Sequence, residues 1–394
     1  MGKISKAERH FLEFAIDLAS RQVRSVRPNP AVGCVLIQPS GHGSSAEDPL
    51  GFPKPLAIGV TATGGRPHAE TQAIAQARAA GHDLQGATAL VSLEPCCHHG
   101  KTPPCTEALI AAGVKRVVVA IQDPDPRVSG KGVAALRQAG VTVELCAEEP
   151  IIAAAAEVIL GFANRITTGR PMVTLKLAMS LDGRIATAEK ESQWITGPLA
   201  RQQTHLLRAR HDAIMVGTAT VLADNPRLDV RLPGLEHLSP LKVIIDRRRS
   251  IPQEYQIFTP PALLVTRELG SEEQEFFRSV DIHLAEYFQR GKTYDGENSQ
   301  IMLKVLELLG EAGLNSVLVE GGGKLAANLL NLGLVDRLVL FRAPILLGAA
   351  GVPAVGNLEV QKLADHSRWQ PLQQRPVGTD TMEVYRRLTV PPLV

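Results

Sequence analysis

The 394-residue sequence is poor in aromatic residues and carries almost no net charge. Aromatic residues make up 4% of the chain, and 42 basic residues against 40 acidic ones leave a net charge of +2. Such a small charge argues against a long nucleic-acid track or an anionic membrane surface as the binding partner. We therefore expect small-molecule partners, with no nucleic acid and no membrane. A homo-oligomer is compatible with this composition.

Long apolar runs and a signal peptide are also missing. No run of consecutive apolar residues approaches the roughly 18–20 that cross a bilayer. Glu8, Glu13 and Asp17 stand where a signal peptide has no acidic residue, so the sequence predicts a cytoplasmic protein. The 5 cysteines are an odd number in a reducing compartment, which disfavours disulfides.

The pattern of elements predicts an α/β protein of two domains, because 394 residues exceed what one core usually organises. Apolar strand-like segments alternate with helical ones, which is typical of a sheet covered on both faces. A strand is expected at 32–37, an exposed loop in a hairpin-like connection at 38–66, and a helix at 67–81. The boundary falls near 148–170, so the predicted domains span residues 1–150 and 165–394.

The first half contains residues that could bind a metal. "RPHAE" places His68 two residues before Glu70, and "EPCCHHGKTPPC" contains Cys96 and Cys105. Zinc takes three or four ligands from His and Cys, and a catalytic site keeps one position open. His68 and Cys105 fall at predicted helix starts, where the helix dipole stabilises thiolate. Glu70 would face the same cavity and could shuttle a proton to a leaving amine.

Taken one at a time, these residues have simpler explanations. His68 could cap a helix, Glu70 could interact with the helix dipole, and the cysteines could be small core residues. The combined order resembles the H-x-E…P-C-x-x-C signature of zinc nucleobase deaminases, but eight residues separate the two cysteines here instead of two. His98 and His99 remain alternative ligands.

The residues around this longer gap carry a family resemblance. The stretches "RPNPAVGCV", "PHAETQAI", "LEPCCHHGKTPPCTEALIAAGV" and "QDPDP" resemble the deaminase domain of the bifunctional riboflavin biosynthesis enzymes of the RibD family. The resemblance implies a cytidine-deaminase-like fold, zinc on His68, Cys96 and Cys105, Glu70 as proton shuttle, and substrate contacts from Asn29 and Lys101. Cys97 stands where the family usually has serine, and Thr61 where it usually has a substrate-facing histidine; the loop before Thr61 is atypically long.

The second half resembles the reductase domain of the same family, whose fold is similar to dihydrofolate reductase. The matching stretches are "VTLKLAMSLDGRIAT" and "SQWITGPLARQQTHLLRARHDAIMVGTATVLADNPRLDVR". The resemblance implies NADPH as hydride donor and a substrate site formed by Ser192, Arg208, Leu228, Arg231 and Glu320. It implies cofactor contacts from Ala178, Trp194, Thr220, Asp224, Gly322, Gly323, Lys324, Leu325, Ala326, Ala327 and Asn328.

Two features of the second half are ambiguous by themselves. "VEGGGKLAANLL" reads as a strand, a glycine turn and a helix start, a form that suits phosphates but is also common as a purely structural turn. Arg247, in "IDRRRSIP", could touch the cofactor or belong to a solvated run of charge.

The sequence thus predicts a cytoplasmic enzyme for two consecutive steps of riboflavin synthesis. The first is zinc-dependent deamination of 2,5-diamino-6-(phosphoribosylamino)pyrimidinone, and the second is NADPH-dependent reduction of its ribose to a ribityl chain. One alternative is a nucleic-acid-editing zinc deaminase with an unrelated C-terminal domain, which would need a basic, aromatic surface. The other is a structural zinc module on a binding domain, which would need a fourth protein ligand.

Overall fold

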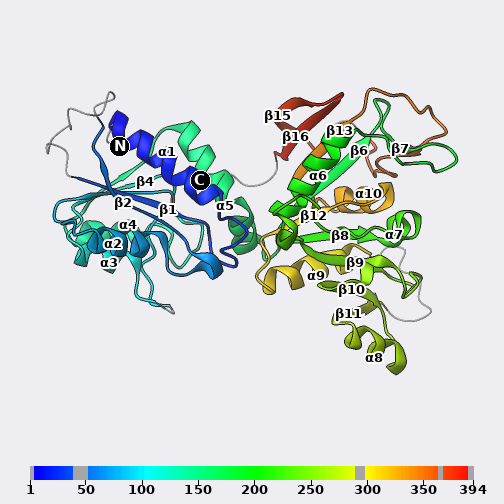
Figure 1. Cartoon of the computed structure of the whole chain (residues 1–394), viewed down its shortest axis with the longest axis horizontal. Coiled ribbons are helices and arrows are strands. Elements are labelled where there is room, and N and C mark those ends of the chain that lie inside the picture. The colour runs from blue at the N-terminus through cyan, green and yellow to red at the C-terminus, as the bar shows by residue number, and fades with distance from the viewer. Residues whose placement is uncertain (1–3, 39–51, 101, 289–297, 363–366, 389–394) are drawn as a thin grey trace. The chain divides into compact units, whose positions relative to one another are not determined.

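The computed structural model describes residues 4–38, 52–100, 102–288, 298–362 and 367–388. It divides the chain into two compact units, Met1–Gly169 and Arg170–Pro391. Each unit has its own sheet and its own core, as the α/β prediction required (Figure 1).

The first unit contains a five-stranded sheet in the order β2-β1-β3-β4-β5. Strand β1 pairs antiparallel with β2 and β3, whereas β3, β4 and β5 run parallel. The carboxyl ends of β3 and β4 therefore lie side by side at one edge of the sheet. The strands are β1 (Gly33–Ile37), β2 (Pro55–Val60), β3 (Thr88–Val91), β4 (Arg116–Val119) and β5 (Thr142–Leu145).

Helices cover both faces of this sheet. Helices α1 and α5 lie on one face, and α2, α3 and α4 lie on the other (Figure 1). Ser5 and Glu8 form a capping box at the start of α1, and Gly169 ends α5 with φ +77°. The helices are α1 (Lys6–Ser20), α2 (Ala69–Ala79), α3 (Cys105–Ala111), α4 (Lys131–Gln138) and α5 (Glu149–Thr168).

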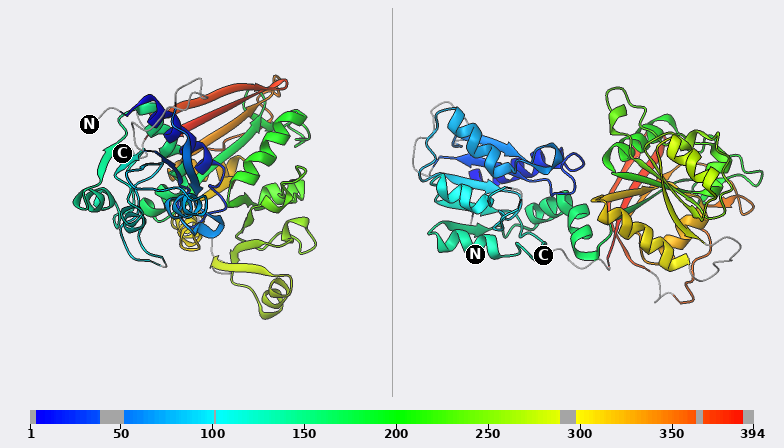
Figure 2. Two further views of the ribbon diagram at one scale, coloured as in Figure 1. Left: turned by 60° about the vertical axis from the view of Figure 1, so that its left-hand side comes forward. Right: turned by 90° about the horizontal axis from the view of Figure 1, so that it is seen from below.

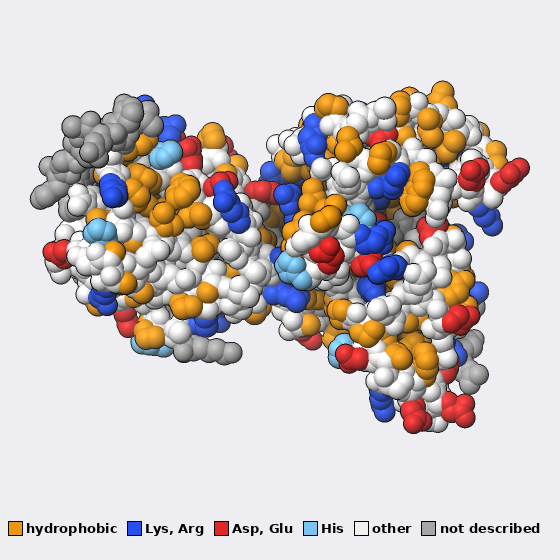
Figure 3. Space-filling model, viewed as in Figure 1, with side chains coloured by type: hydrophobic (Ala, Val, Ile, Leu, Met, Phe, Trp, Pro, Cys, Tyr) orange, Lys and Arg blue, Asp and Glu red, His pale blue; other side chains and the backbone are white. Residues whose placement is uncertain are grey.

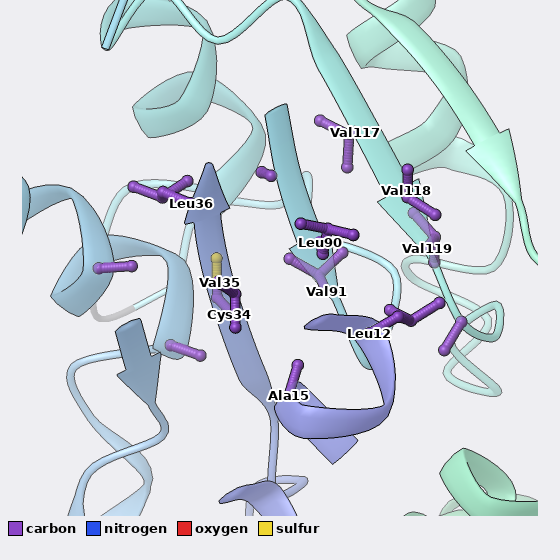
Figure 4. Close-up of a cluster of buried hydrophobic side chains, with 14 of the residues drawn as sticks. Leu12, Ala15, Cys34, Val35, Leu36, Leu90, Val91, Val117, Val118 and Val119 are labelled. Carbon is purple, nitrogen blue, oxygen red and sulfur yellow. The ribbon is translucent and has the colours of Figure 1, made fainter. Parts of the chain in front are cut away.

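Aliphatic side chains form the core between these layers. All five residues of β1 are buried, as expected for a central strand that is covered on both faces. Figure 4 shows Leu12 and Ala15 of α1 beside side chains of β1, β3 and β4, including Val35, Leu90 and Val118. This core fixes the sheet from whose edge the loops of the site emerge.

Strand β2 corrects the expectation of a loop over 38–66, which is wrong for residues 55–60; residues 39–51 lie outside the described residues. The predicted hairpin-like connection does exist, since β1 and β2 pair antiparallel. This strand is hard to predict from the sequence because it contains proline and glycine, which are uncommon in strands. Pro55 is its first residue, where an edge strand tolerates proline. Gly59 is needed because a Cβ there would lie 2.0 Å from the carbonyl oxygen of Ala69 in α2.

The second unit contains a nine-stranded sheet in the order β11-β10-β9-β8-β12-β6-β13-β16-β15. Seven strands are parallel, and the hairpin of β15 and β16 adds an antiparallel edge. The strands are β6 (Met172–Met179), β8 (Ala213–Gly217), β9 (Leu241–Asp246), β10 (Ala262–Arg267), β11 (Ile282–Phe288), β12 (Ser316–Val319), β13 (Arg337–Arg342), β15 (Trp369–Val377) and β16 (Asp380–Arg387). A separate small sheet pairs β7 (Arg184–Ala186) with β14 (Val352–Pro353).

Alternate strand residues face two different layers of helices in this unit. Met215 of β8 packs in the cluster that contains α9 and α10, whereas its neighbours Ile214 and Val216 pack in the cluster that contains α7 and α8. Figure 2 shows the sheet lying between helices. The helices are α6 (Pro198–Arg210), α7 (Thr218–Asp224), α8 (Ser271–Ser279), α9 (Asn298–Glu311) and α10 (Gly323–Asn331). Among the described residues, short 3-10 turns span Thr63–Gly65 in the first unit, and Glu236–Leu238 and Gln256–Phe258 in the second.

Helix α5 is long and apolar enough to cross a membrane by length and composition alone. The sequence contains no matching apolar run, because Glu157 and Asn164 interrupt it. Four of its buried residues, Ile151, Ala155, Ile159 and Ala163, belong to the core of the first unit. Packing against α1 therefore accounts for its apolar character.

A buried ion pair at the start of the second unit yields a stability prediction. Arg170 binds Asp336 through two hydrogen bonds of 2.7 and 2.8 Å, and Asp336 also accepts the backbone N–H of Val173. Asp336→Ala should lower the free energy of unfolding by about 3–5 kcal/mol, because it removes the carboxylate that pairs with a buried guanidinium. Urea unfolding can be followed by the fluorescence of Trp194 and Trp369, which both lie in this unit.

Glu275→Ala, an exposed position on α8, is the control and should change the unfolding free energy by less than about 0.5 kcal/mol. Equal effects of the two substitutions would contradict a stabilising role for the pair.

Candidate active sites

Three potential metal ligands meet at the carboxyl edge of the first sheet. His68 is the N-cap residue of α2, and Cys105 is the first residue of α3. Cys96 lies in the turn that follows β3. The ligand atoms of the three residues all lie within 4.8 Å of one another. The structure thus brings together the three ligands that the sequence motif predicted.

The contacts within this group favour a thiolate. His68 Nδ1 lies 3.3 Å from Cys105 Sγ and 3.6 Å from Cys96 Sγ, and the backbone N–H of Cys105 donates to Cys96 Sγ at 3.4 Å. A hydrogen bond from the Cys105 thiol lowers the pKa of Cys96 to about 4, although burial opposes this shift. The same hydrogen bond raises the pKa of Cys105.

The donor set fits zinc. One imidazole nitrogen and two sulfurs are ligands that zinc prefers, and three protein ligands with a free fourth position are typical of a catalytic zinc site. The group contains these three residues and no others among the residues that the structure describes.

Glu70 lies in the first turn of α2, two residues after His68, and is only 3% exposed. Burial raises the pKa of its carboxyl group, and the negative charge of Cys96 adds to the shift. It is close enough to Cys105 for a side-chain hydrogen bond, yet it is not one of the three grouped ligands. A carboxyl group in this position is available for proton transfer.

The expected substrate contacts of the first unit have different outcomes. Asn29 donates from Nδ2 to the carbonyl of Gly65, three residues before His68, at 2.8 Å. Lys101 lies outside the described residues. Thr61, which replaces the family's histidine, is 2% exposed and accepts the backbone N–H of Val32 at 3.0 Å. Its hydroxyl is therefore engaged with the backbone.

The neighbouring residues in "CCHH" are not part of the grouped ligands. Cys97 Sγ faces the carbonyl of Arg127 at 3.9 Å, and burial raises the pKa of its thiol. His99 Nε2 lies 3.1 Å from Glu107 on the surface of α3. Cys97 and His99 thus have partners other than the three grouped ligands.

Three buried acids near this site were not singled out by the sequence. Glu94 accepts backbone N–H groups from the loop after β4 and from α4. Asp123 accepts the N–H of Asp125, and burial raises the pKa of Asp123 to about 7. Asp125 accepts three side-chain hydrogen bonds from Arg127 that help hold the loop. Their sequence signals were the family matches of "LEPCCHHGKTPPCTEALIAAGV", which contains Glu94, and "QDPDP", which contains Asp123 and Asp125; neither gave individual roles.

A charged cluster occupies the interior of the second unit. Arg208, in the last turn of α6, donates to Glu320 at 2.7 and 3.1 Å, and Lys176 of β6 lies 3.6 Å from the same carboxylate. All three side chains are at most 13% exposed. Burial acts to raise the pKa of Glu320, but the charges of Arg208 and Lys176 outweigh it and lower the pKa to about 2. Lys176 was missed because "VTLKLAMS" reads simply as a strand.

A second basic group adjoins this cluster. Arg227 and Arg231 pair with the carboxylate of Asp229, whose backbone carbonyl accepts a hydrogen bond from Arg208 at 3.0 Å. Leu228, between them, is 3% exposed with φ +56°. Figure 3 shows Lys and Arg side chains gathered with acidic ones in a hollow on the face of the second unit. Such a surface suits an anionic group.

The expected cofactor residues before 225 lie on different elements. Ala178 lies two positions after Lys176 on β6 and so points to the same face. Trp194 is 68% exposed, with the guanidinium of Arg201 4.5 Å from its ring centre. The side chains of Ser192 and Asp224 form a hydrogen bond, while burial raises the pKa of Asp224.

The glycine turn leads from β12 into α10. Gly322 is the N-cap residue of the helix, and its N–H donates to Thr220 Oγ1 at 2.9 Å. The side chain of Ala326 is fully buried and that of Ala327 is 5% exposed, so a ligand at this helix start would meet mainly backbone groups and Lys324. Leu325 packs against the core, and Asn328 lies a turn further along the helix. Arg247 follows the end of β9.

Two family models match the chain. The model of the cytidine and deoxycytidylate deaminase zinc-binding region matches residues 5–121, which include the three grouped ligands. The model of the RibD C-terminal domain matches residues 171–382. The deaminase model thus matches within the first compact unit, and the model of the RibD C-terminal domain matches within the second.

Curated relatives match nearly the whole chain. The riboflavin biosynthesis protein RibD of Escherichia coli (strain K12) is 38% identical over 389 residues, covering 95% of this chain and 97% of the relative. The protein of the same name from Aquifex aeolicus (strain VF5) is 33% identical, covering 98% of this chain and 99% of the relative.

Solved structures agree with these relatives. RibD of Acinetobacter baumannii (form 1) has a TM-score of 0.80 at 34% identity, with 98% of this chain and 99% of that chain covered. A diaminohydroxyphosphoribosylaminopyrimidine deaminase/5-amino-6-(5-phosphoribosylamino)uracil reductase of Thermotoga maritima has a TM-score of 0.78 at 31% identity, with 97% and 99% covered.

The resemblance first seen in short motifs is thus confirmed over both halves, which excludes an unrelated C-terminal domain. The chain belongs to the RibD family of riboflavin biosynthesis proteins, enzymes in which a zinc-binding deaminase domain is followed by a reductase domain.

Proposed function

We propose that the first unit deaminates 2,5-diamino-6-(phosphoribosylamino)pyrimidinone and that the second reduces the ribose of the product to a ribityl chain with NADPH. The enzyme would act in the cytoplasm on small phosphorylated pyrimidines. The observation that carries this proposal is the meeting of His68, Cys96 and Cys105 beside the buried carboxyl group of Glu70.

In the deaminase site, His68, Cys96 and Cys105 would hold the zinc ion. When bound, zinc lowers the pKa of water at its open position and so supplies a nucleophile at neutral pH. Glu70 would accept a proton at its carboxylate and deliver it to the departing amine. Asn29 and Lys101 would hold the substrate. Thr61 would contribute through the loop it anchors, because its hydroxyl binds the backbone of Val32.

In the reductase site, the substrate phosphate would be bound by the arginines, since planar guanidinium groups form paired hydrogen bonds with phosphate. Arg208 binds the backbone carbonyl of Asp229, Arg231 binds its carboxylate, and Glu320 keeps Arg208 in place. Lys176 joins this group through its contact with Glu320. Ser192 and Leu228 would complete the substrate site.

NADPH would lie at the carboxyl ends of β8, β12 and β6, three neighbouring parallel strands. Ligands of α/β proteins commonly bind at this edge, and helix starts there present N–H groups to phosphate. When bound, NADPH supplies the hydride. The residues proposed to contact it are Ala178, Trp194, Thr220, Asp224, Gly322, Gly323, Lys324, Leu325, Ala326, Ala327 and Asn328.

Removing either cysteine ligand should abolish zinc retention. We expect about one zinc per chain in the unaltered protein and only a small fraction of that in Cys96→Ala or Cys105→Ala, because two ligands no longer complete the site. Metal content after dialysis measures this. Cys97→Ser is the matched control and should keep its zinc, because Cys97 faces the carbonyl of Arg127. Zinc retained by both alanine variants would refute the ligand set.

Removing the proton carrier should separate the two activities. Glu70→Gln should slow deamination by about 10²–10⁴-fold, the usual contribution of a general acid–base. Reduction of the already deaminated compound should continue near the normal rate, because the reductase site lies in the other unit. Mass spectrometry of both reactions tests this. Glu107→Gln, an exposed glutamate on α3, should affect neither activity. Loss of both activities in folded Glu70→Gln would contradict the two-site proposal.

The reductase should prefer NADPH over NADH. Charge-assisted hydrogen bonds of about 1.5–3 kcal/mol to the additional phosphate would make kcat/KM about 10–100-fold higher with NADPH. Arg247→Ala tests whether the arginine run after β9 reads that phosphate: it should reduce the preference and leave the rate with NADH unchanged. Arg278→Ala, on the surface of α8, is the control. Equal efficiency of the two cofactors in the unaltered enzyme would contradict the assignment.

A further inference from the structure

Glu94 is a buried carboxylate that the proposed deamination does not use. It is 3% exposed and follows β3 by three residues. Its Oε2 accepts the backbone N–H groups of Asp123 at 3.2 Å and Gly130 at 2.9 Å, and its Oε1 accepts that of Val133 at 3.0 Å. One side chain therefore joins the loop after β4 and the start of α4 to the turn after β3.

The turn that carries Glu94 is also held by its backbone. The N–H of Glu94 donates to the carbonyl of Ile121 at 3.0 Å. At Gly132, in the first turn of α4, an added Cβ would lie 2.1 Å from the carbonyl oxygen of Pro95. The start of α4 thus packs directly on the residue that precedes Cys96, with no room for a side chain.

Cys96 is fixed from the opposite side as well. Its carbonyl accepts the backbone N–H of Thr106 at 3.2 Å and the hydroxyl of the same residue at 3.3 Å. The start of α3 therefore holds one side of Cys96, and the Glu94 turn holds the other. Because Cys105 opens α3, the relative position of the two sulfurs depends on both anchors.

We propose that Glu94 is a positioning residue for the metal centre: by binding the start of α4 it sets the place of Cys96 relative to Cys105 and His68. This inference rests on the proposed zinc site. Groups that orient metal ligands from outside the coordination sphere typically change metal affinity by about 10–100-fold when they are altered. The carboxylate also stabilises the N-terminus of α4, so its contribution to stability must be separated from its contribution to metal binding.

Glu94→Gln tests the inference. The amide keeps the side-chain volume but turns an N–H toward at least one of the three backbone N–H donors, which pushes the turn away from α4. We expect zinc affinity, measured on folded protein by competition with a chelator, to fall by about 10–100-fold. Cobalt bound in place of zinc should show altered thiolate-to-metal absorption, which reports the arrangement of the sulfurs. The reduction of the deaminated compound should not change.

Glu8→Gln is the matched control. Glu8 is also a buried carboxylate in the first unit, 6% exposed, and it caps α1 by accepting the N–H of Ser5 while it binds Arg116. Its substitution should lower thermal stability but change zinc affinity by less than about twofold, since it does not touch the turn of Cys96. A second variant, Gly132→Ala, should repeat the loss of zinc affinity, because its methyl group displaces Pro95.

The results distinguish a failure of this inference from a failure of the proposed zinc site. Unchanged zinc affinity and cobalt spectrum in folded Glu94→Gln would overturn the inference and leave the zinc site intact. Equal losses of affinity in Glu94→Gln and Glu8→Gln would overturn it too, because they would trace the effect to stability alone. If the unaltered protein binds no zinc, the proposed metal site itself is wrong.

Discussion

Parallel pairing of neighbouring strands is the constraint on which both sites depend. In the first unit it places the ends of β3 and β4 side by side, and in the second it does so for β8, β12 and β6. The helices that follow begin at the same edge, so their N-termini and the strand-end loops converge. Cys105 in one unit and Gly322 in the other occupy such helix starts. His68 opens α2 after β2, which runs in the same direction as β3 because both strands pair antiparallel with β1. Residues far apart in sequence thereby meet without any local pattern that links them.

Sites at these edges contain buried charged side chains, and the two units stabilise these charges in different ways. Glu94 is satisfied by backbone N–H groups, which fix the course of a loop. Glu320 is satisfied by the side chains of Arg208 and Lys176. A carboxylate held by backbone shapes the site, whereas one held by cations keeps those cations charged and oriented. The low pKa of Glu320 is a consequence of the second arrangement.

Short motifs and the periodicity of apolar residues were sufficient to predict the fold class and the grouping of the candidate metal ligands. The α/β class follows from alternating elements, and the gathering of His68, Cys96 and Cys105 follows from a spaced motif. Strand β2 was missed because Pro55 and Gly59 reduce strand propensity, and the need for Gly59 comes from α2, which no strand pattern contains. Glu94 and Lys176 were missed because their partners are distant in the sequence. The backbone donors to Glu94 lie 29 to 39 positions away, and Glu320, the partner of Lys176, follows the end of β12.

The three glycines after β12 show how a motif and a structure can give different reasons for the same residues. A Cβ at Gly323 would lie 2.6 Å from the carbonyl oxygen of Pro353, and one at Gly321 would lie 2.9 Å from the side chain of Leu325. Packing against backbone therefore requires glycine at position 323 whatever binds nearby, whereas at position 321 the obstacle is the end of a flexible side chain that can move. Gly322 is different, because its nearest obstacle is Thr220 Oγ1 at 3.5 Å, an ordinary contact. A phosphate at this turn would therefore be bound by the N-terminus of α10 at the strand edge, whatever the number of glycines.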